Sequence, residues 1–173
     1  INDFSFNEDN SYLLDLDAED YDGDELVYTI EGGEGSSIST TINGNSIEFT
    51  PLSNFNGSES FIITVSDGEL SDVQIVIISI IAINDEPVAQ AINLDVNEDE
   101  QTAIILDGLD IDGDPISYSI INNPIGTIIS IEGSIVNYVP QLNFIGTDSF
   151  SYKVSDGILD SEEAIVTLTV NDV

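Results

Sequence analysis

The sequence predicts an all-β protein made of two tandem Greek-key β-sandwich domains in an elongated arrangement. Three observations support this prediction: the chain repeats itself, its apolar residues alternate with polar ones over short stretches, and no long stretch has the spacing of an amphipathic helix. The repeats meet at Asn84-Asp85-Glu86-Pro87, where a proline opens the second copy. We therefore expect domains at residues 1–84 and 85–173.

The repeat appears when the chain is aligned with itself. Asn7-Glu8-Asp9 recurs about 90 residues later as Asn97-Glu98-Asp99, and the offset shortens by one residue further along. The other segments that match in the same order are 20–24 with 110–114 (DxDGD), 28–30 with 118–120 (YxI), 51–55 with 140–144 (PxxNF) and 65–68 with 154–157 (VSDG). Chance is a poor explanation for so many matches in one order.

Within each repeat the apolar residues alternate as they do in strands with one buried face. Phe61, Ile63 and Val65 occupy alternate positions, and Asn43-Gly44 between two such runs indicates a hairpin. In about 88 residues each repeat has room for seven short strands, which is typical of an immunoglobulin-like β-sandwich. In the second repeat the expected strands are 88–96, 102–107, 115–121, 126–131, 134–139, 147–155 and 162–170.

Large aromatic and β-branched residues are expected to form the cores. Phe55 and Phe144 lie in the loop before the sixth strand of each repeat, where we expect them to plug one end of the sandwich. A platform for stacking sugars is the alternative for these two rings. The residues expected inside the sandwiches are Phe49, Phe61, Tyr118, Tyr138, Phe150 and Val166.

The charge of the chain excludes several classes of function. The chain carries 34 Asp and Glu residues but a single basic residue, Lys153, so its net charge is −33. Binding to nucleic acids or to anionic membranes requires cationic side chains, so neither is expected. The absence of His and Cys removes zinc fingers, Ser-His and Cys-His nucleophiles and disulfides. With 41% hydrophobic residues the chain is nevertheless expected to fold.

Several features indicate an exported protein. The chain begins at Ile1 with neither Met nor a leader, which suggests a piece of something longer. The longest apolar run, Ile75–Ile83, is far shorter than the roughly 20 residues that a membrane-spanning helix needs, so no membrane insertion is expected. Repeats, acidity and the absence of cysteine together fit an extracellular bacterial protein, either secreted or at the cell surface.

The acidic residues gather in loops that a Greek-key sandwich places together. Alternate loops lie at opposite ends of such a fold, and the linker brings one end of each domain to the same junction. The second repeat contributes Asp107, Asp110, Asp112, Asp114 and Asp156, and the first contributes Glu8, Asp9, Asn54, Asn56, Asn84 and Asp85. Calcium prefers such mixed oxygen ligands more than magnesium does. The alternative is that acidity serves only solubility in a salty medium.

The DxDGD segments are not EF-hands. An EF-hand loop requires an acidic residue two positions before the first Asp of this segment, and those positions hold Ala18 and Gly108. The segments therefore have to act together with other loops to bind a metal.

The succession NED, DxDGD, YxI, PxxNF, VSDG and NDxP resembles the bacterial cadherin-like tandem repeats of large exported surface proteins and adhesins, over nearly the whole chain and twice. The resemblance implies Ca²⁺ at the junction, with Asn54 and Asn56 replacing an acidic pair and lowering the charge of the ligand set. The implied ligands are Glu8, Asn54, Asn56, Asn84, Asp85, Asp110, Asp112 and Asp156. Half-sites that would face further repeats are implied at Asp20, Asp22, Asp67, Glu98 and Asn143.

The leading functional hypothesis is a calcium-rigidified, non-enzymatic segment of a bacterial adhesion protein. Its expected partners are neighbouring repeats of the same chain, with like repeats or surface glycans as further partners. The alternative is a carbohydrate-binding module of a secreted polysaccharide-associated protein, with Tyr12, Tyr21 and Phe55 as stacking residues, although the chain has no Trp. A glycosidase is disfavoured because the Asp clusters lie in polar loops, where no carboxyl group would gain a raised pKa.

Overall fold

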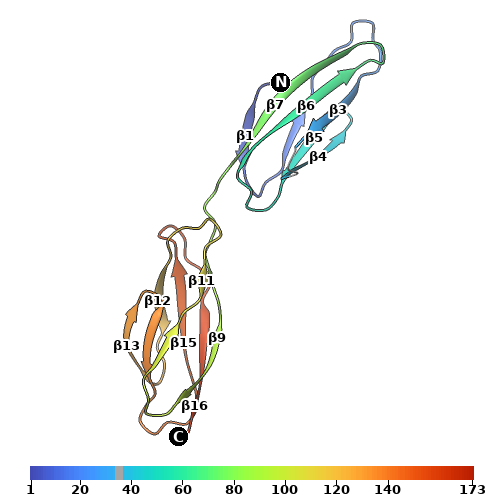
Figure 1. Cartoon of the computed structure of the whole chain (residues 1–173). Helices are drawn as coiled ribbons and strands as arrows, with labels where there is room; N and C mark the ends of the chain where they lie inside the picture. The colour runs from blue at the N-terminus through green and yellow to red at the C-terminus, as the bar shows by residue number, and fades with distance from the viewer. Residues whose placement is uncertain (34–36) are drawn as a thin grey trace. The chain divides into compact units, whose positions relative to one another are not determined.

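The chain forms two compact units. The computed structural model describes residues 1–33 and 37–173, and these divide into unit 1, Ile1–Ile83, and unit 2, Asn84–Val173 (Figure 1). All regular elements within the described residues are strands, which confirms the predicted all-β class. The described part of the chain contains no helix that is long and apolar enough to cross a membrane.

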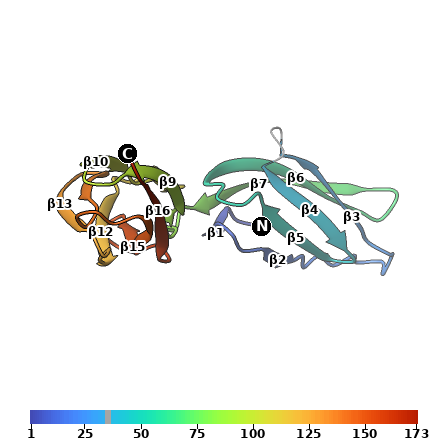
Figure 2. The ribbon, with the colours of Figure 1, turned by 90° about the horizontal axis from the view of Figure 1, so that it is seen from below.

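Unit 1 is a sandwich of two sheets (Figure 2). The four-stranded sheet has the order β1-β7-β6-β3 and the three-stranded sheet has the order β2-β5-β4. The predicted hairpin is present, with Gly44 at φ 62° in the turn that joins β4 to β5. The strands are β1 (Phe4–Asn7), β2 (Tyr12–Asp15), β3 (Val27–Gly32), β4 (Ile38–Asn43), β5 (Ser46–Pro51), β6 (Gly57–Ser66) and β7 (Ser71–Ile81).

Unit 2 repeats this architecture with two additional short strands. Its sheets have the orders β12-β15-β16-β9 and β10-β14-β13, together with a two-stranded ladder of β11 and β8. The strands are β8 (Val88–Ala89), β9 (Ile92–Asn97), β10 (Thr102–Ile105), β11 (Gly108–Leu109), β12 (Ser117–Asn122), β13 (Thr127–Glu132), β14 (Ile135–Val139), β15 (Gly146–Ser155) and β16 (Ala164–Asn171).

The prediction of one first strand over 88–96 is wrong, because the chain changes partner within that segment. β8 pairs antiparallel with β11, whereas β9 pairs parallel with β16. Gln90, between the two strands, is fixed on both sides: its N–H donates to the Asp107 carbonyl at 3.0 Å, and its carbonyl accepts the Tyr152 hydroxyl at 2.6 Å. These bonds satisfy the backbone where the ladder is interrupted.

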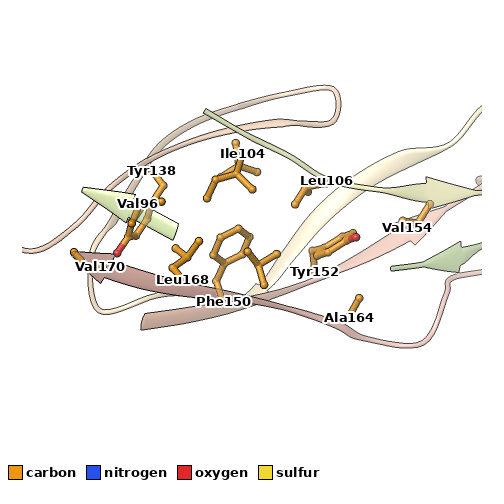
Figure 3. Packing of buried hydrophobic residues seen from close by; sticks show 12 residues of the cluster. Val96, Ile104, Leu106, Tyr138, Phe150, Tyr152, Val154, Ala164, Leu168 and Val170 are labelled. Carbon is orange, nitrogen blue, oxygen red and sulfur yellow. The ribbon is translucent and has the colours of Figure 1, made fainter. Parts of the chain in front are cut away.

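Each sandwich has its own apolar core. In unit 2, Phe150 lies at the centre of the cluster with Ile104 and Leu168 around it (Figure 3). Phe49, Phe61, Tyr138, Phe150 and Val166 are buried as predicted, while Tyr118 is partly buried against the core. Phe55 and Phe144 each pack against the core of their unit, as expected for plugs. Each fully buried side chain of this size contributes about 1.5–3 kcal/mol.

The core of unit 2 contains a polar pair. The Tyr138 hydroxyl donates to Asp148 Oδ2 at 2.7 Å, and the backbone N–H groups of Ile125 and Gly126 donate to the same carboxylate at 2.8 Å each. Asp148 is 3% exposed. Burial alone would raise the pKa of Asp148, but the hydrogen bonds from Gly126, Ile125 and Tyr138 hold it below its ordinary value. The pair thus ties the loop between β12 and β13 to β15.

Candidate metal centre

The last residue of unit 1 is held by a buried carboxylate. The N–H of Ile83 donates to Glu8 Oε1 at 2.7 Å, and the N–H of Glu8 donates to the Ile81 carbonyl at 3.0 Å. Glu8 follows β1, which pairs parallel with β7, so the exit from the last strand runs beside it. Only 2% of Glu8 is exposed. The Glu of the NED motif therefore fixes the point at which the chain leaves unit 1.

The first two residues of unit 2 are held by the acidic loops. The Asn84 side-chain amide donates to Asp156 Oδ2 at 2.8 Å, and the N–H of Asp85 donates to Asp112 Oδ2 at 2.7 Å. The structure thus brings together four of the predicted ligand residues within unit 2. Three consecutive residues, Ile83, Asn84 and Asp85, are each fixed by a different carboxylate.

Asp156 serves both the linker and its own turn. Its Oδ1 accepts the N–H groups of Ile158 and Leu159 at 2.6 and 2.7 Å. The Asn84 amide, followed by these two backbone groups, lowers the pKa of Asp156. Asp67 forms the same turn in unit 1, where the N–H groups of Leu70 and Glu69 lower its pKa. The need to form this turn is therefore by itself a sufficient reason for the VSDG motif to recur.

Two of the predicted ligands have a carboxylate oxygen that is buried without a hydrogen-bond partner, as does Glu59, which is not a predicted ligand. The two ligand oxygens are Glu8 Oε2 in unit 1 and Asp110 Oδ2 in unit 2. Asp110 is 7% exposed, and its other oxygen accepts the N–H of Asp114 at 3.1 Å. A buried carboxylate oxygen that lacks a partner is costly unless a cation compensates it.

The residues present fit a hard cation. Among residues 1–33 and 37–173, no three His, Cys, Asp or Glu side chains are grouped closely enough to hold a metal by themselves. The available donors are carboxylate, amide and carbonyl oxygens, which Ca²⁺ accepts in flexible sets of six to eight. Within each unit, the uncompensated oxygen of Glu8 or of Asp110 is a specific position at which such an ion would be stabilising.

Asn54 and Asn56 lie in the loop before β6 and are exposed. The N–H of Asn54 donates to Asp9 Oδ1 at 3.0 Å. Asn54 and Asp9 both have left-handed backbone, with φ of 56° and 57°, respectively. Unit 2 repeats this contact between Asn143 and Asp99 at 2.8 Å. Asp9 was expected at the junction but is not in the implied ligand set, and neither is Asp99. Asp9 and Asp99 are each the third residue of the recurring NED motif, and this recurrence was the sequence signal that they hold the loop.

Each predicted half-site residue occupies the position that one of the implied ligands occupies in the other unit. Asp20 Oδ1 accepts the N–H groups of Asp22 and Asp24 at 2.8 and 3.0 Å, which closes the loop upon itself. Glu98 repeats the position of Glu8, and its N–H donates to the Asn171 carbonyl at 2.9 Å. A hydrogen bond with the Asp172 side chain raises the pKa of Glu98.

The three aromatic residues considered for sugar binding differ in their surroundings. Tyr12 stacks within unit 1 on Phe4 and Phe6, at ring-centre distances of 4.6 and 5.4 Å. Phe55 packs against the core, whereas Tyr21 is fully exposed. Only Tyr21 of the three is thus a freely accessible ring.

Comparisons with known proteins agree with this fold. A family model described as "Bacterial Ig domain" matches residues 1–79 and again residues 84–169. No curated protein sequence gives a significant match.

Solved structures with a similar fold include EC1-2 of human protocadherin-24, which is 20% identical over 92% of this chain and 88% of that chain, with a TM-score of 0.57. EC1-2 of human mucin-like protocadherin is 17% identical over 98% of this chain and 95% of that chain, with a TM-score of 0.52. An endo-fucoidan hydrolase from glycoside hydrolase family 107 is 21% identical over 100% of this chain and 28% of that chain. Its TM-score of 0.41 is too low to carry an argument.

At these identities the structural likeness shows the fold alone. The double match to one family and the cadherin structures confirm the resemblance that the recurring motifs indicated. The chain belongs to the bacterial Ig domain family, of which it contains two tandem copies.

Proposed function

We propose that the two domains form a calcium-stiffened, non-enzymatic segment of a bacterial cell-surface or secreted protein that takes part in adhesion. The observation that carries the proposal is that Glu8 of unit 1 and Asp110 of unit 2 each keep a buried, uncompensated carboxylate oxygen, while Glu8 and Asp112 hold the consecutive stretch Ile83–Asp85. Neighbouring repeats of the same chain are the natural partners of such a segment.

Covalent continuity explains how one cation could engage both units. Glu8 holds Ile83, and the next residue, Asn84, is held by Asp156. Consecutive Cα atoms are only about 3.8 Å apart, so donors anchored to these residues cannot separate far. In the proposal, Ca²⁺ binds Glu8 of unit 1 together with Asp85, Asp110 and Asp112 of unit 2, with the exposed Asn54 and Asn56 able to add amide oxygens.

Stiffening follows from linkage between binding and conformation. If the full ligand set exists only in one range of linker conformations, calcium favours that range by its binding free energy. Extracellular modules bind Ca²⁺ with dissociation constants of about 10⁻⁴–10⁻³ M. Calcium at about 100 times the dissociation constant would contribute about 2.7 kcal/mol, which is enough to suppress bending. A stiff row of repeats would hold an adhesive end clear of the cell.

Isothermal titration calorimetry tests the ligand set. Ca²⁺ added to the whole chain at pH 7 should bind in the range above, and Glu8→Gln should weaken the strongest site at least about tenfold because it removes a charged ligand. Glu98→Gln is the matched control, since it removes the equivalent carboxylate of unit 2 away from Ile83–Asp85. No binding by the wild-type chain, or equal losses in the two variants, would contradict the proposed site.

A further inference from the structure

The outward face of β6 and β7, the two central strands of the large sheet in unit 1, is apolar and carries no charged side chain. β6 and β7 lie side by side in this sheet (Figure 1), and Ile62 pairs with Ile75 across them. Ile75 is 66% exposed and Ile77 is 43% exposed, although Val76 between them is fully buried. The outward positions of the two strands are Ser58, Ser60, Ile62, Thr64, Ser66, Ser71, Val73, Ile75, Ile77, Ser79 and Ile81. None of these residues carries a charge, in a chain whose net charge is −33.

The same face of unit 2 is polar. Ser151 pairs with Ile165 there, in the place of the Ile62–Ile75 pair, and Thr167 occupies the place of Ile77. The Asn122 side-chain amide donates to Ser151 Oγ at 2.8 Å and to Glu163 Oε1 at 2.7 Å, so polar groups cover this face. The apolar face is therefore a property of unit 1 and is not required by the shared fold.

From this contrast we propose that the β6–β7 face of unit 1 binds the same face of a second copy of this chain. Two such faces are self-complementary, because each consists of a central Ile and Val cluster surrounded by Ser and Thr. Pairing the faces about a two-fold axis buries isoleucine against isoleucine and leaves the hydroxyl groups at the rim. Packing of two sheet faces about 10 Å apart is the arrangement that β-sandwiches use internally.

The available area fits a weak dimer. The β6–β7 face together with β1 and β3, which would form its rim, comprises four strands about 4.8 Å apart with on average about eight residues at about 3.4 Å each, or about 500 Å² per copy. Two copies would thus bury about 1,000 Å², which is the lower limit for a specific interface and typical of transient contacts.

The charge pattern favours a second copy and fixes the salt dependence. Two chains of net charge −33 repel each other, and a contact can form most easily where neither copy presents a carboxylate. The carboxylates beside this face lie at its two edges: Asp3, just before β1, accepts the N–H of Ile77 at 2.8 Å, and Glu31 on β3 pairs with Ile62. Because salt screens the remaining repulsion without weakening apolar burial, self-association should strengthen as the salt concentration rises. The contact does not involve the proposed calcium ligands.

Sedimentation velocity on the whole chain in chelator tests the proposal. The weight-average sedimentation coefficient should rise between about 10 µM and 1 mM protein, and should rise further in 1 M NaCl, where the Debye length falls to about 3 Å. Ile75→Glu should keep the chain monomeric under all these conditions. Ile165→Glu introduces the same change at the equivalent position of unit 2 and should self-associate like the wild type.

Amide shifts in NMR spectra distinguish loss of the contact from loss of the fold. Ile75→Thr should give a dispersed spectrum of a folded unit 1 and should also weaken association. In the wild-type chain, shifts that depend on protein concentration should map to β6 and β7 and leave β15 and β16 unchanged. A wild-type chain that stays monomeric at 1 mM protein in 1 M NaCl, or association that Ile165→Glu abolishes as fully as Ile75→Glu, would overturn the proposal.

Discussion

Asp148→Ala should lower the free energy of unfolding of unit 2 by about 3–5 kcal/mol, because the change strands one buried and two partly buried hydrogen-bond donors at once. The Tyr138 hydroxyl and the N–H groups of Ile125 and Gly126 all donate to this carboxylate. Tyr138 is completely buried, so its hydroxyl cannot turn to water instead. Denaturant unfolding followed by circular dichroism, with amide hydrogen exchange to separate the units, measures the loss.

Tyr138→Phe is the graded control for this prediction. Unit 1 has Phe49 at the equivalent place, and Glu59 there accepts the N–H of Ser37 at 3.1 Å, so the fold tolerates phenylalanine. Tyr138→Phe removes one bond and leaves the two backbone bonds, so it should cost about 1–2 kcal/mol. A loss below 1 kcal/mol for Asp148→Ala would contradict the anchoring role.

The contribution of Asp148 should disappear in acid. Its pKa is lowered in the folded state, so the folded state favours the ionised carboxylate. Its stabilising effect is therefore complete above the unfolded-state pKa of about 3.9 and is lost as the pH falls through the folded-state pKa. The difference in stability between the wild type and Asp148→Ala should accordingly be constant from pH 5 to 8 and should shrink below pH 4.

Asp110→Asn should change the stability of unit 2 in opposite directions with and without calcium. In chelator the variant should be more stable than the wild type by about 1 kcal/mol, because it replaces an uncompensated buried carboxylate with a neutral amide. In calcium at about 100 times its dissociation constant the wild type should gain about 2.7 kcal/mol, and the variant should gain little of it. Thermal unfolding followed by circular dichroism measures both differences.

Asp20→Asn is the matched control, since Asp20 occupies the same position in unit 1 and already accepts two backbone N–H groups. It should leave the calcium-dependent gain of unit 2 intact. A variant Asp110→Asn that is destabilised in chelator and still gains fully from calcium would show that this carboxylate has only a structural role.

Much of the fold could be predicted from the sequence, because the repeat provides an internal comparison. Phe61 and Phe150 lie in matching runs of alternating residues, and both strands exist with the predicted inward faces. The break between β8 and β9 could not be predicted, because it depends on Tyr152 reaching the Gln90 carbonyl across the fold. Asp148 lies two residues before Phe150, on the same inward-facing side of the strand, so the alternating pattern indicates that it is buried. The pattern does not indicate that Tyr138 is its hydrogen-bond partner.

The candidate site was harder to predict because one residue can serve two purposes. Glu8 recurs as Glu98, as a calcium ligand would, but Glu8 also accepts the N–H of Ile83, which by itself gives a reason to recur. Asp9 likewise recurs as Asp99 because it holds the following loop at Asn54. Sequence spacing cannot separate these structural roles from metal binding, because both require a carboxylate at the same recurring position. The buried oxygen of Glu8 that lacks a partner is the further observation that favours a metal there, and it becomes visible only in the folded structure.

Backbone ¹⁵N relaxation on the whole chain tests most directly whether calcium couples the two domains. With saturating Ca²⁺, the amides of unit 1 and unit 2 should share one long rotational correlation time, as expected for a single body of 18.6 kDa. In chelator each unit should tumble faster, with its own shorter correlation time and unchanged internal order. Identical correlation times in the two conditions would show that calcium does not restrict the linker and would contradict the proposed function.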